Sequence, residues 1–90
     1  MKITFEEKIT REVEITSFPA YRKTDYSFFK VIDEKTCIWV HESFDGETDS
    51  VSRSSIMLAY TDKSTESNKA EFNEAFERVG LNLASLVNGD

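Results

Sequence analysis

Cys37 and His41 are the single thiol and the single imidazole of this 90-residue chain, so a Cys/His nucleophile pair is the first chemistry to consider. Both lie in a segment with the composition of a β-strand, where residues four positions apart share a face. Their Cα atoms would be about 13 Å apart, far beyond hydrogen-bond distance. We therefore expect no catalytic residues and no enzymatic activity, with Cys37 as a small buried thiol and His41 at a strand end.

A metal site would need several ligands with compatible spacing, and these two side chains are too far apart to begin a zinc site. The segment from Asp45 to Asp49 has acidic residues at alternate positions, which suggests a calcium-binding loop. An EF-hand loop that started at Asp45 would need Gly at its sixth position and Glu at its twelfth, but Gly46 is second and Ile56 is twelfth. We expect a solvated loop, with no metal ion and no cofactor.

Charge and length limit the partners of this chain. The net charge is -6, and both halves are acidic, which disfavours nucleic acid because its binding depends largely on neutralising phosphates with Lys and Arg. The longest apolar run, Ile56 to Tyr60, is far shorter than the ~20 residues of a membrane span or the ~7 to 15 of a signal-peptide core. A lone cysteine excludes an intramolecular disulfide. We expect a cytoplasmic protein without membrane contact.

The strands that would position these side chains belong to an α+β fold over residues 1–90, which we expect to form one domain. Alternating apolar residues predict a strand over 9–17, and residues 1–8 form either a short extra strand or a flexible leader. Further strands are predicted over 20–32, with an interruption at 24–25 as an alternative, over 36–43 and over 54–61. A loop over 44–53 separates the last two. The result is an antiparallel four-stranded meander.

The C-terminal quarter has the signals of a helix. Asn68 and Glu71 resemble a capping box, and they open an apolar series at spacings of four and three: Phe72, Phe76, Val79, Leu83 and Leu86. A Schellman motif at Gly80 and Leu81 is the alternative end. Because the apolar phase continues past the glycine, whose cost in a helix is only about 1 kcal/mol, we expect one helix to about residue 87, packed on one sheet face.

Aromatic residues concentrate in the predicted strands. Within the third strand, Ile38 and Val40 face one side of the sheet, and Trp39 faces the other together with Cys37 and His41. A helix about 10 to 12 Å wide covers one face incompletely, so one apolar face is left for a partner or, as the alternative, for residues 1–8 of the chain itself. Trp is enriched in interface hot spots. We therefore expect self-association, or binding of another protein, through Trp39, Cys37, His41, Phe28 and Met57.

Two alternatives remain open at this stage. The first is a small-molecule-binding domain, whose pocket between helix and sheet would be lined by Tyr21, Tyr26 and Tyr60. The second is a single-stranded nucleic-acid binder, in which sheet aromatics stack on bases beside Arg22, Lys23 and Lys30. The leading expectation is a small non-enzymatic interaction domain that acts as a homodimer or binds another protein.

Overall fold

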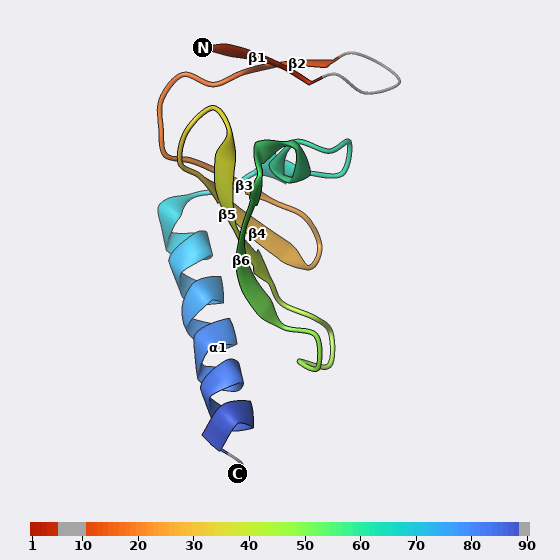
Figure 1. Ribbon diagram of the computed structural model, residues 1–90, viewed down its shortest axis with the longest axis vertical. Coiled ribbons are helices and arrows are strands. Elements are labelled where there is room, and N and C mark those ends of the chain that lie inside the picture. The colour runs from red at the N-terminus through yellow and green to blue at the C-terminus, as the bar shows by residue number, and fades with distance from the viewer. Residues whose placement is uncertain (6–10, 89–90) are drawn as a thin grey trace.

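The fold is a five-stranded antiparallel sheet with one long helix across one of its faces (Figure 1). The computed structural model describes residues 1–5 and 11–88. The sheet order is β6-β5-β4-β3-β7, and β1 and β2 form a separate hairpin at one end of the molecule. In chain order the elements are β1 (Lys2–Phe5), β2 (Arg11–Glu14), β3 (Ala20–Lys23), β4 (Ser27–Val31), β5 (Thr36–His41), β6 (Ser50–Ser55), the 3-10 helix η1 (Ile56–Ala59), β7 (Thr65–Glu66) and α1 (Lys69–Asn88).

The α+β class, the antiparallel sheet and the C-terminal helix confirm the expectation from the sequence, but the strand arrangement differs. The main sheet has a fifth strand, β7, which pairs with β3. Strand β2 lies outside that sheet and pairs with β1, which is the short extra strand expected near the N-terminus. Residues 6–8 of the expected extra strand or leader, and Ile9 and Thr10 of the strand predicted over 9–17, lie outside the described residues.

The long strand predicted over residues 20–32 is two strands, β3 and β4, joined by a turn. Thr24 N donates to Ser27 O at 2.9 Å across this turn, and Phe28 and Phe29 then pair with Lys23 and Arg22. The interruption considered at 24–25 therefore marks a hairpin. Because the chain reverses here, the two strands lie side by side in the sheet instead of end to end.

The predicted strand over 54–61 is wrong. The strand, β6, begins earlier at Ser50, inside the predicted loop, and the apolar residues Ile56–Ala59 form η1. Ser55 caps η1, because its Oγ accepts a hydrogen bond from Met57 N at 3.3 Å. A short apolar run that is buried on several sides fits a helical turn as well as a strand, and its periodicity does not separate the two.

Helix α1 begins and ends close to the predicted positions. Asn68 Oδ1 accepts a hydrogen bond from Glu71 N at 2.9 Å, which is the N-cap interaction that the sequence indicated. The helix continues through Gly80 to Asn88, as expected from the apolar phase. Neither α1 nor any other helix in the described ranges is long and apolar enough to cross a membrane.

The sheet separates two hydrophobic clusters. On the helix face, which α1 covers, Val40 packs with Phe72, Ala75 and Val79 of the helix. On the opposite face, which we call the tryptophan face, sheet residues pack with residues in or next to η1 and the N-terminal hairpin. The buried members of this cluster are Phe5, Ile15, Phe29, Val31, Cys37, Ile56, Ala59 and Tyr60. The predicted division of β5, with Ile38 and Val40 on one side and Trp39 on the other, is confirmed.

Candidate interaction surface

Trp39 is half-buried on the tryptophan face and is held by its own neighbours. Its Nε1 donates to Ser27 Oγ at 2.9 Å, and its ring stacks on Phe29 with centroids 6.3 Å apart. The His41 ring meets the indole edge-on at 5.9 Å, and His41 Nδ1 lies 3.4 Å from the same serine hydroxyl. The indole therefore leans over β4, and the chain itself provides part of the cover that the sequence left open.

Cys37 is fully buried, so it lines no exposed surface. Its Sγ donates to Ser55 O at 3.5 Å, and burial raises the pKa of the thiol to about 11. The side chain is therefore a protonated core residue at neutral pH. His41 is on the same face at the other end of β5, hydrogen-bonded to Ser27.

Phe28 is on the helix face, so the structure does not bring it together with Trp39. Phe28 pairs with Val40 across the β4–β5 ladder and packs on the cluster under α1, whereas Phe29 is the residue opposite Trp39. Met57 does share the tryptophan face, where it is half-buried in η1. Of the five residues expected at an interface, Trp39, His41 and Met57 are therefore partly accessible on one face.

The three tyrosines of the predicted ligand pocket do not meet between the helix and the sheet. Tyr21 packs on Phe72 under the helix, with ring centroids 5.9 Å apart. Tyr60 is buried in the cluster on the other face, where burial raises its pKa, and Tyr26 is exposed beside the β3–β4 turn. No pocket between helix and sheet unites them in the described part of the chain.

A polar cleft of about 260 Å³ does lie at the β3 edge, and both Tyr21 and Tyr60 line it. Arg22 extends into this cleft: its Nη2 donates to Ser64 O at 3.1 Å and to Ser64 Oγ at 2.9 Å, and its guanidinium lies 5.0 Å from the centre of the Tyr60 ring. Its Nε is buried and has no hydrogen-bond partner among the described residues. Glu14 and Glu66 also line the cleft, which therefore offers both charge signs.

The cations expected beside the aromatic residues are divided between the two faces. Arg22 lies on the tryptophan face, and Lys23 and Lys30 lie on the helix face. Lys23 Nζ is 2.9 Å from Glu71 Oε2, so its charge is already compensated. A stacking surface with interleaved cations, as a single-stranded nucleic-acid binder needs, is not assembled from these residues.

Strand β6 is an edge strand, and no described strand pairs with its outer side. Ile56 N donates to Lys35 O, and this pair continues the register of the β5–β6 ladder. The even-numbered residues of β6 therefore form the backbone hydrogen bonds to β5. In an antiparallel ladder the alternate residues point their backbone groups the other way, so N–H and C=O of Val51 and Arg53 face outward. This edge carries free hydrogen-bonding groups that a further strand can use.

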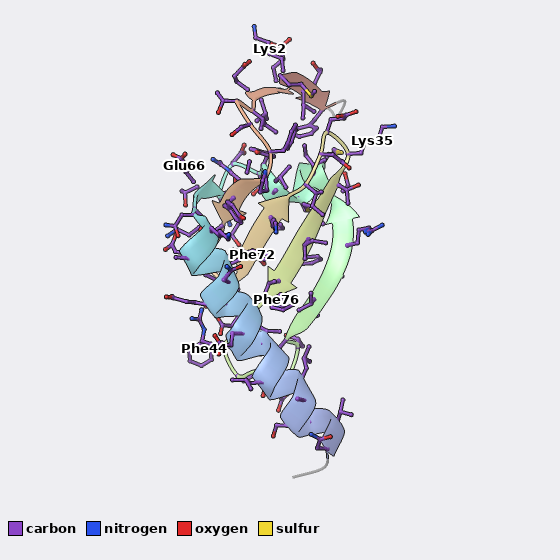
Figure 2. All side chains as sticks on the ribbon, turned by 90° about the vertical axis from the view of Figure 1, so that its left-hand side faces the viewer. Lys2, Lys35, Phe44, Glu66, Phe72 and Phe76 are labelled. Carbon is purple, nitrogen blue, oxygen red and sulfur yellow. The ribbon has the colours of Figure 1, made fainter. Side chains whose placement is uncertain are left out.

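Several exposed apolar side chains belong to β6, to the loop that precedes it and to α1. Ten large hydrophobic side chains of the described residues are exposed, and six of them belong to α1, β6 or the loop over residues 42–49: Phe44, Val51, Phe76, Leu81, Leu86 and Val87. Phe44 is 94% exposed and Val87 is 84% exposed. Figure 2 shows Phe44 beside the middle of the helix, and in Figure 1 the end of α1 extends past the sheet.

The 42–49 loop is fixed to α1 by four hydrogen bonds. Arg78 donates to both carboxylate oxygens of Glu42 at 2.7 and 2.9 Å. Asn82 Nδ2 donates to Gly46 O and to Asp49 Oδ2, both at 2.9 Å. Because the loop is held to the helix, β6, this loop and the C-terminal half of α1 form one continuous region, which we call the β6–α1 surface.

Comparison with known proteins adds no family to this description, because no family model, curated protein or solved structure matches the chain. Across residues 1–5 and 11–88, no group of three or more His, Cys, Asp or Glu side chains could hold a metal ion. The strongest functional features of the described residues are therefore the β6–α1 surface and the cleft at Arg22.

Proposed function

We propose that this chain is a small, non-enzymatic interaction domain that binds a protein through the β6–α1 surface. The observation that carries the proposal is that five of the ten exposed large apolar side chains of the described residues belong to the elements of that surface: Phe44, Val51, Leu81, Leu86 and Val87. Single exposed apolar groups are ordinary, but an open strand edge with exposed apolar side chains on the elements beside it is typical of a protein interface. The expected interface on the tryptophan face thus moves to the adjoining edge, with Trp39 and His41 one strand away.

The end of α1 supports this proposal. Its apolar stripe is buried at Phe72, Ala75 and Val79, half-buried at Leu83, and exposed at Leu86 and Val87. The stripe therefore continues beyond the part of the helix that the sheet covers (Figure 1). A helix usually presents such a stripe to a core, and here the last turns present it to solvent, where a partner can bury it.

The 42–49 loop supports it in a different way. Four hydrogen bonds from Arg78 and Asn82 hold the loop in place before any partner binds. Ordering a flexible loop on binding costs conformational entropy, so a loop that is already held lowers the cost of association. Phe44 at its tip is thereby presented on a fixed support.

Affinity purification of the tagged full chain, from the cells that produce it, tests this function. We expect at least one protein, which includes the untagged chain itself, to be retained by the wild type and lost with the double variant Leu86→Glu/Val87→Glu. Leu58→Glu is the matched control, because Leu58 is an exposed apolar residue in η1, outside the β6–α1 surface. An identical set of retained proteins for all three chains contradicts the proposal.

The cleft at Arg22 favours a second candidate function, the binding of a small polar molecule with a hydrogen-bond acceptor. The buried, unpartnered Nε of Arg22 supports it, because such a donor is costly to leave without an acceptor. A thermal-shift screen of small carboxylic acids and amino acids tests it, since a ligand that binds the folded state raises the melting temperature. A shift that Arg22→Met removes and Lys30→Met retains supports binding; no shift with any compound contradicts it.

A further inference from the structure

We propose that the partner of the β6–α1 surface is a second copy of this chain, which adds its β6 antiparallel to the first β6 in a register centred on Ser52. This inference rests on the proposed function and names its partner. The two five-stranded sheets would join into one continuous sheet across a two-fold axis at Ser52.

The two edges of the sheet differ in how they are protected. Strand β7, at one edge, has only two residues, and a short edge strand is a common protection against further pairing. Strand β6, at the other edge, has six residues, SVSRSS, with no Pro and no Gly. Its one charge, Arg53, forms no ion pair among the described residues. β6 is therefore the edge at which strand addition is expected.

Side-chain parity limits the possible registers. Val51 and Arg53 lie on the helix face, and Ser50, Ser52 and Ser54 lie on the tryptophan face, as their partners in β5 show. Residues directly opposite each other in an antiparallel pair point to the same face of the sheet. A symmetric pair of β6 strands must therefore place one residue directly opposite the same residue of the second copy. Within β6 the central choices are Ser52 and its two neighbours.

Charge and overlap select Ser52 among these. A register centred on Arg53 places the two guanidinium groups directly opposite each other, and like charges in that position are destabilising. A register centred on Val51 pairs only residues 50–52 of the two strands. The register centred on Ser52 pairs residues 50–54, and it places Arg53 opposite Val51 of the second copy, where its aliphatic stem packs on an apolar side chain.

Charge complementarity also favours the antiparallel arrangement. The 42–49 loop, which precedes β6, contains four acidic residues and no Lys or Arg: Glu42, Asp45, Glu47 and Asp49. Antiparallel pairing brings the C-terminal part of one β6, with Arg53, toward the loop that precedes the other β6. Each Arg53 therefore approaches the acidic loop of the other copy, so the contact occurs twice in the symmetric pair, and the attraction is expected to weaken as salt rises.

The backbone groups are suitably placed for this register. In this register Val51 is opposite Arg53 of the second copy, and Arg53 is opposite its Val51. The outward N–H and C=O groups of these residues would then form hydrogen bonds between the two strands. Ser52 bonds to β5 and forms the non-hydrogen-bonded pair on the axis, where Cα atoms are about 4.5 Å apart. Because Trp39 is opposite Ser52 in β5, the pairing also aligns Trp39, Ser52, Ser52 and Trp39 of the two copies in one row.

A disulfide at Ser52 tests the register. The expected Cα separation at the axis is compatible with a disulfide, whereas moving the axis by one residue separates the two Ser52 Cα atoms by about 8 Å, beyond its reach. We expect Ser52→Cys to give a covalent dimer on mild oxidation and Ser50→Cys, which faces Ser54 of the second copy, to give no covalent dimer. The wild type controls for Cys37, which is fully buried.

Substitutions of Arg53 test the expected attraction to the acidic loop. Arg53→Glu places a carboxylate beside the acidic loop of the second copy. We therefore expect the dissociation constant of the dimer to rise roughly tenfold or more, whereas Arg53→Gln should raise it less. A Ser52→Cys chain that forms no covalent dimer under oxidation, or a Ser50→Cys chain that is cross-linked instead, overturns the inference. The proposed function is tested separately, by the affinity purification. It is contradicted when the Leu86→Glu/Val87→Glu variant retains the same proteins as the wild type, whatever the cross-linking result.

Discussion

Trp39 lies directly opposite Ser52 in the β5–β6 ladder, so the largest side chain on this face of the sheet is paired with one of the smallest. The indole leans away from Ser52, toward Phe29 and Ser27 of β4. The serines of β6 are consequently left as a low, polar row along the open edge. A strand that adds to β6 meets only hydroxyl groups on this face, and no bulky side chain has to move.

The hydrogen bond from Trp39 to Ser27 gives the first prediction. Ser27→Ala removes the acceptor of the indole N–H in a mostly buried position, so the free energy of unfolding should fall by about 1 kcal/mol. Urea unfolding followed by the fluorescence of Trp39 measures this. Ser50→Ala, on the same face of the edge strand, should change the free energy by less than about 0.5 kcal/mol. Equal effects of the two substitutions would contradict this role of Ser27.

The two glycines at positions 46 and 80 should respond in opposite directions to alanine. Gly80 lies inside α1, and a Cβ there would meet no described atom within 4 Å, so Gly80→Ala should stabilise the fold by about 0.5 to 1 kcal/mol. Gly46 has φ +78°, and a Cβ there would lie 3.2 Å from Asn82 Nδ2. Gly46→Ala should therefore destabilise the loop by about 1 kcal/mol or more.

Melting temperatures of the two glycine variants check this pair. A destabilised Gly80→Ala chain would mean that the helix does not pass undistorted through that position. An unaffected Gly46→Ala chain would mean that the loop is not held against Asn82 in the way the hydrogen bonds indicate.

The N-cap of α1 gives a third prediction. Asn68→Ala leaves Glu71 N–H without its acceptor, so the fold should lose about 1 kcal/mol. Asn73→Ala is the matched control, because Asn73 is exposed inside the helix, where alanine has the better propensity. Circular dichroism during urea unfolding should show a lower midpoint for the first variant and an equal or higher one for the second. The reverse order would remove Asn68 as the cap.

Glu71 links helix α1 to strand β3 and gives a prediction for pH. The hydrogen bonds from Lys23 and Ser67 hold the pKa of Glu71 below its ordinary value. A carboxyl whose folded pKa is lowered adds stability above its unfolded pKa, and that stability is lost as pH falls through the folded value. Glu71→Gln should therefore unfold at lower urea than the wild type at pH 7.

The same comparison at pH 3 completes the test of Glu71. The difference between wild type and Glu71→Gln should be much smaller there, because the wild-type carboxyl is then increasingly protonated in the folded chain. Glu77→Gln, at an exposed position of the same helix, should show little difference at either pH. A gap between wild type and Glu71→Gln that grows toward low pH would contradict the sign of the pKa shift.

Local signals in the sequence predicted the parts of the fold that depend on local interactions. Asn68 and Glu71 indicated the helix start because an N-cap is a contact between residues three apart. The division of β5 into Ile38 and Val40 on one face and Trp39 on the other followed from strand geometry alone. Neither inference required knowledge of what lies beyond the segment itself.

The predictions that differ from the structure concern how one strand pairs with the next. Strand β6 has the serine-rich composition of a loop and is a strand because it pairs with β5. From the sequence we expect Phe28 on the face of Trp39, but Phe29 is opposite Trp39 in the structure. The face of a β4 residue depends on the register of β4 with β5, which the turn at Asp33 sets. The β6–α1 surface depends on strand order in the same way. The residues around Val51 and Arg53 do not indicate that the backbone groups of these two residues face an open edge.

Val51→Pro gives the most direct measurement of the central claim, that the chain associates with a second copy through the edge of β6. Proline removes the outward N–H of Val51 and leaves the hydrogen bonds between β5 and β6 in place, as proline does at solvent-facing positions of edge strands. Sedimentation velocity at concentrations up to about 1 mM would compare the two chains. We expect the wild type to shift from monomer to dimer as concentration rises, while Val51→Pro stays folded and monomeric. A wild type that remains monomeric throughout, or a folded Val51→Pro chain that dimerises equally well, would contradict it.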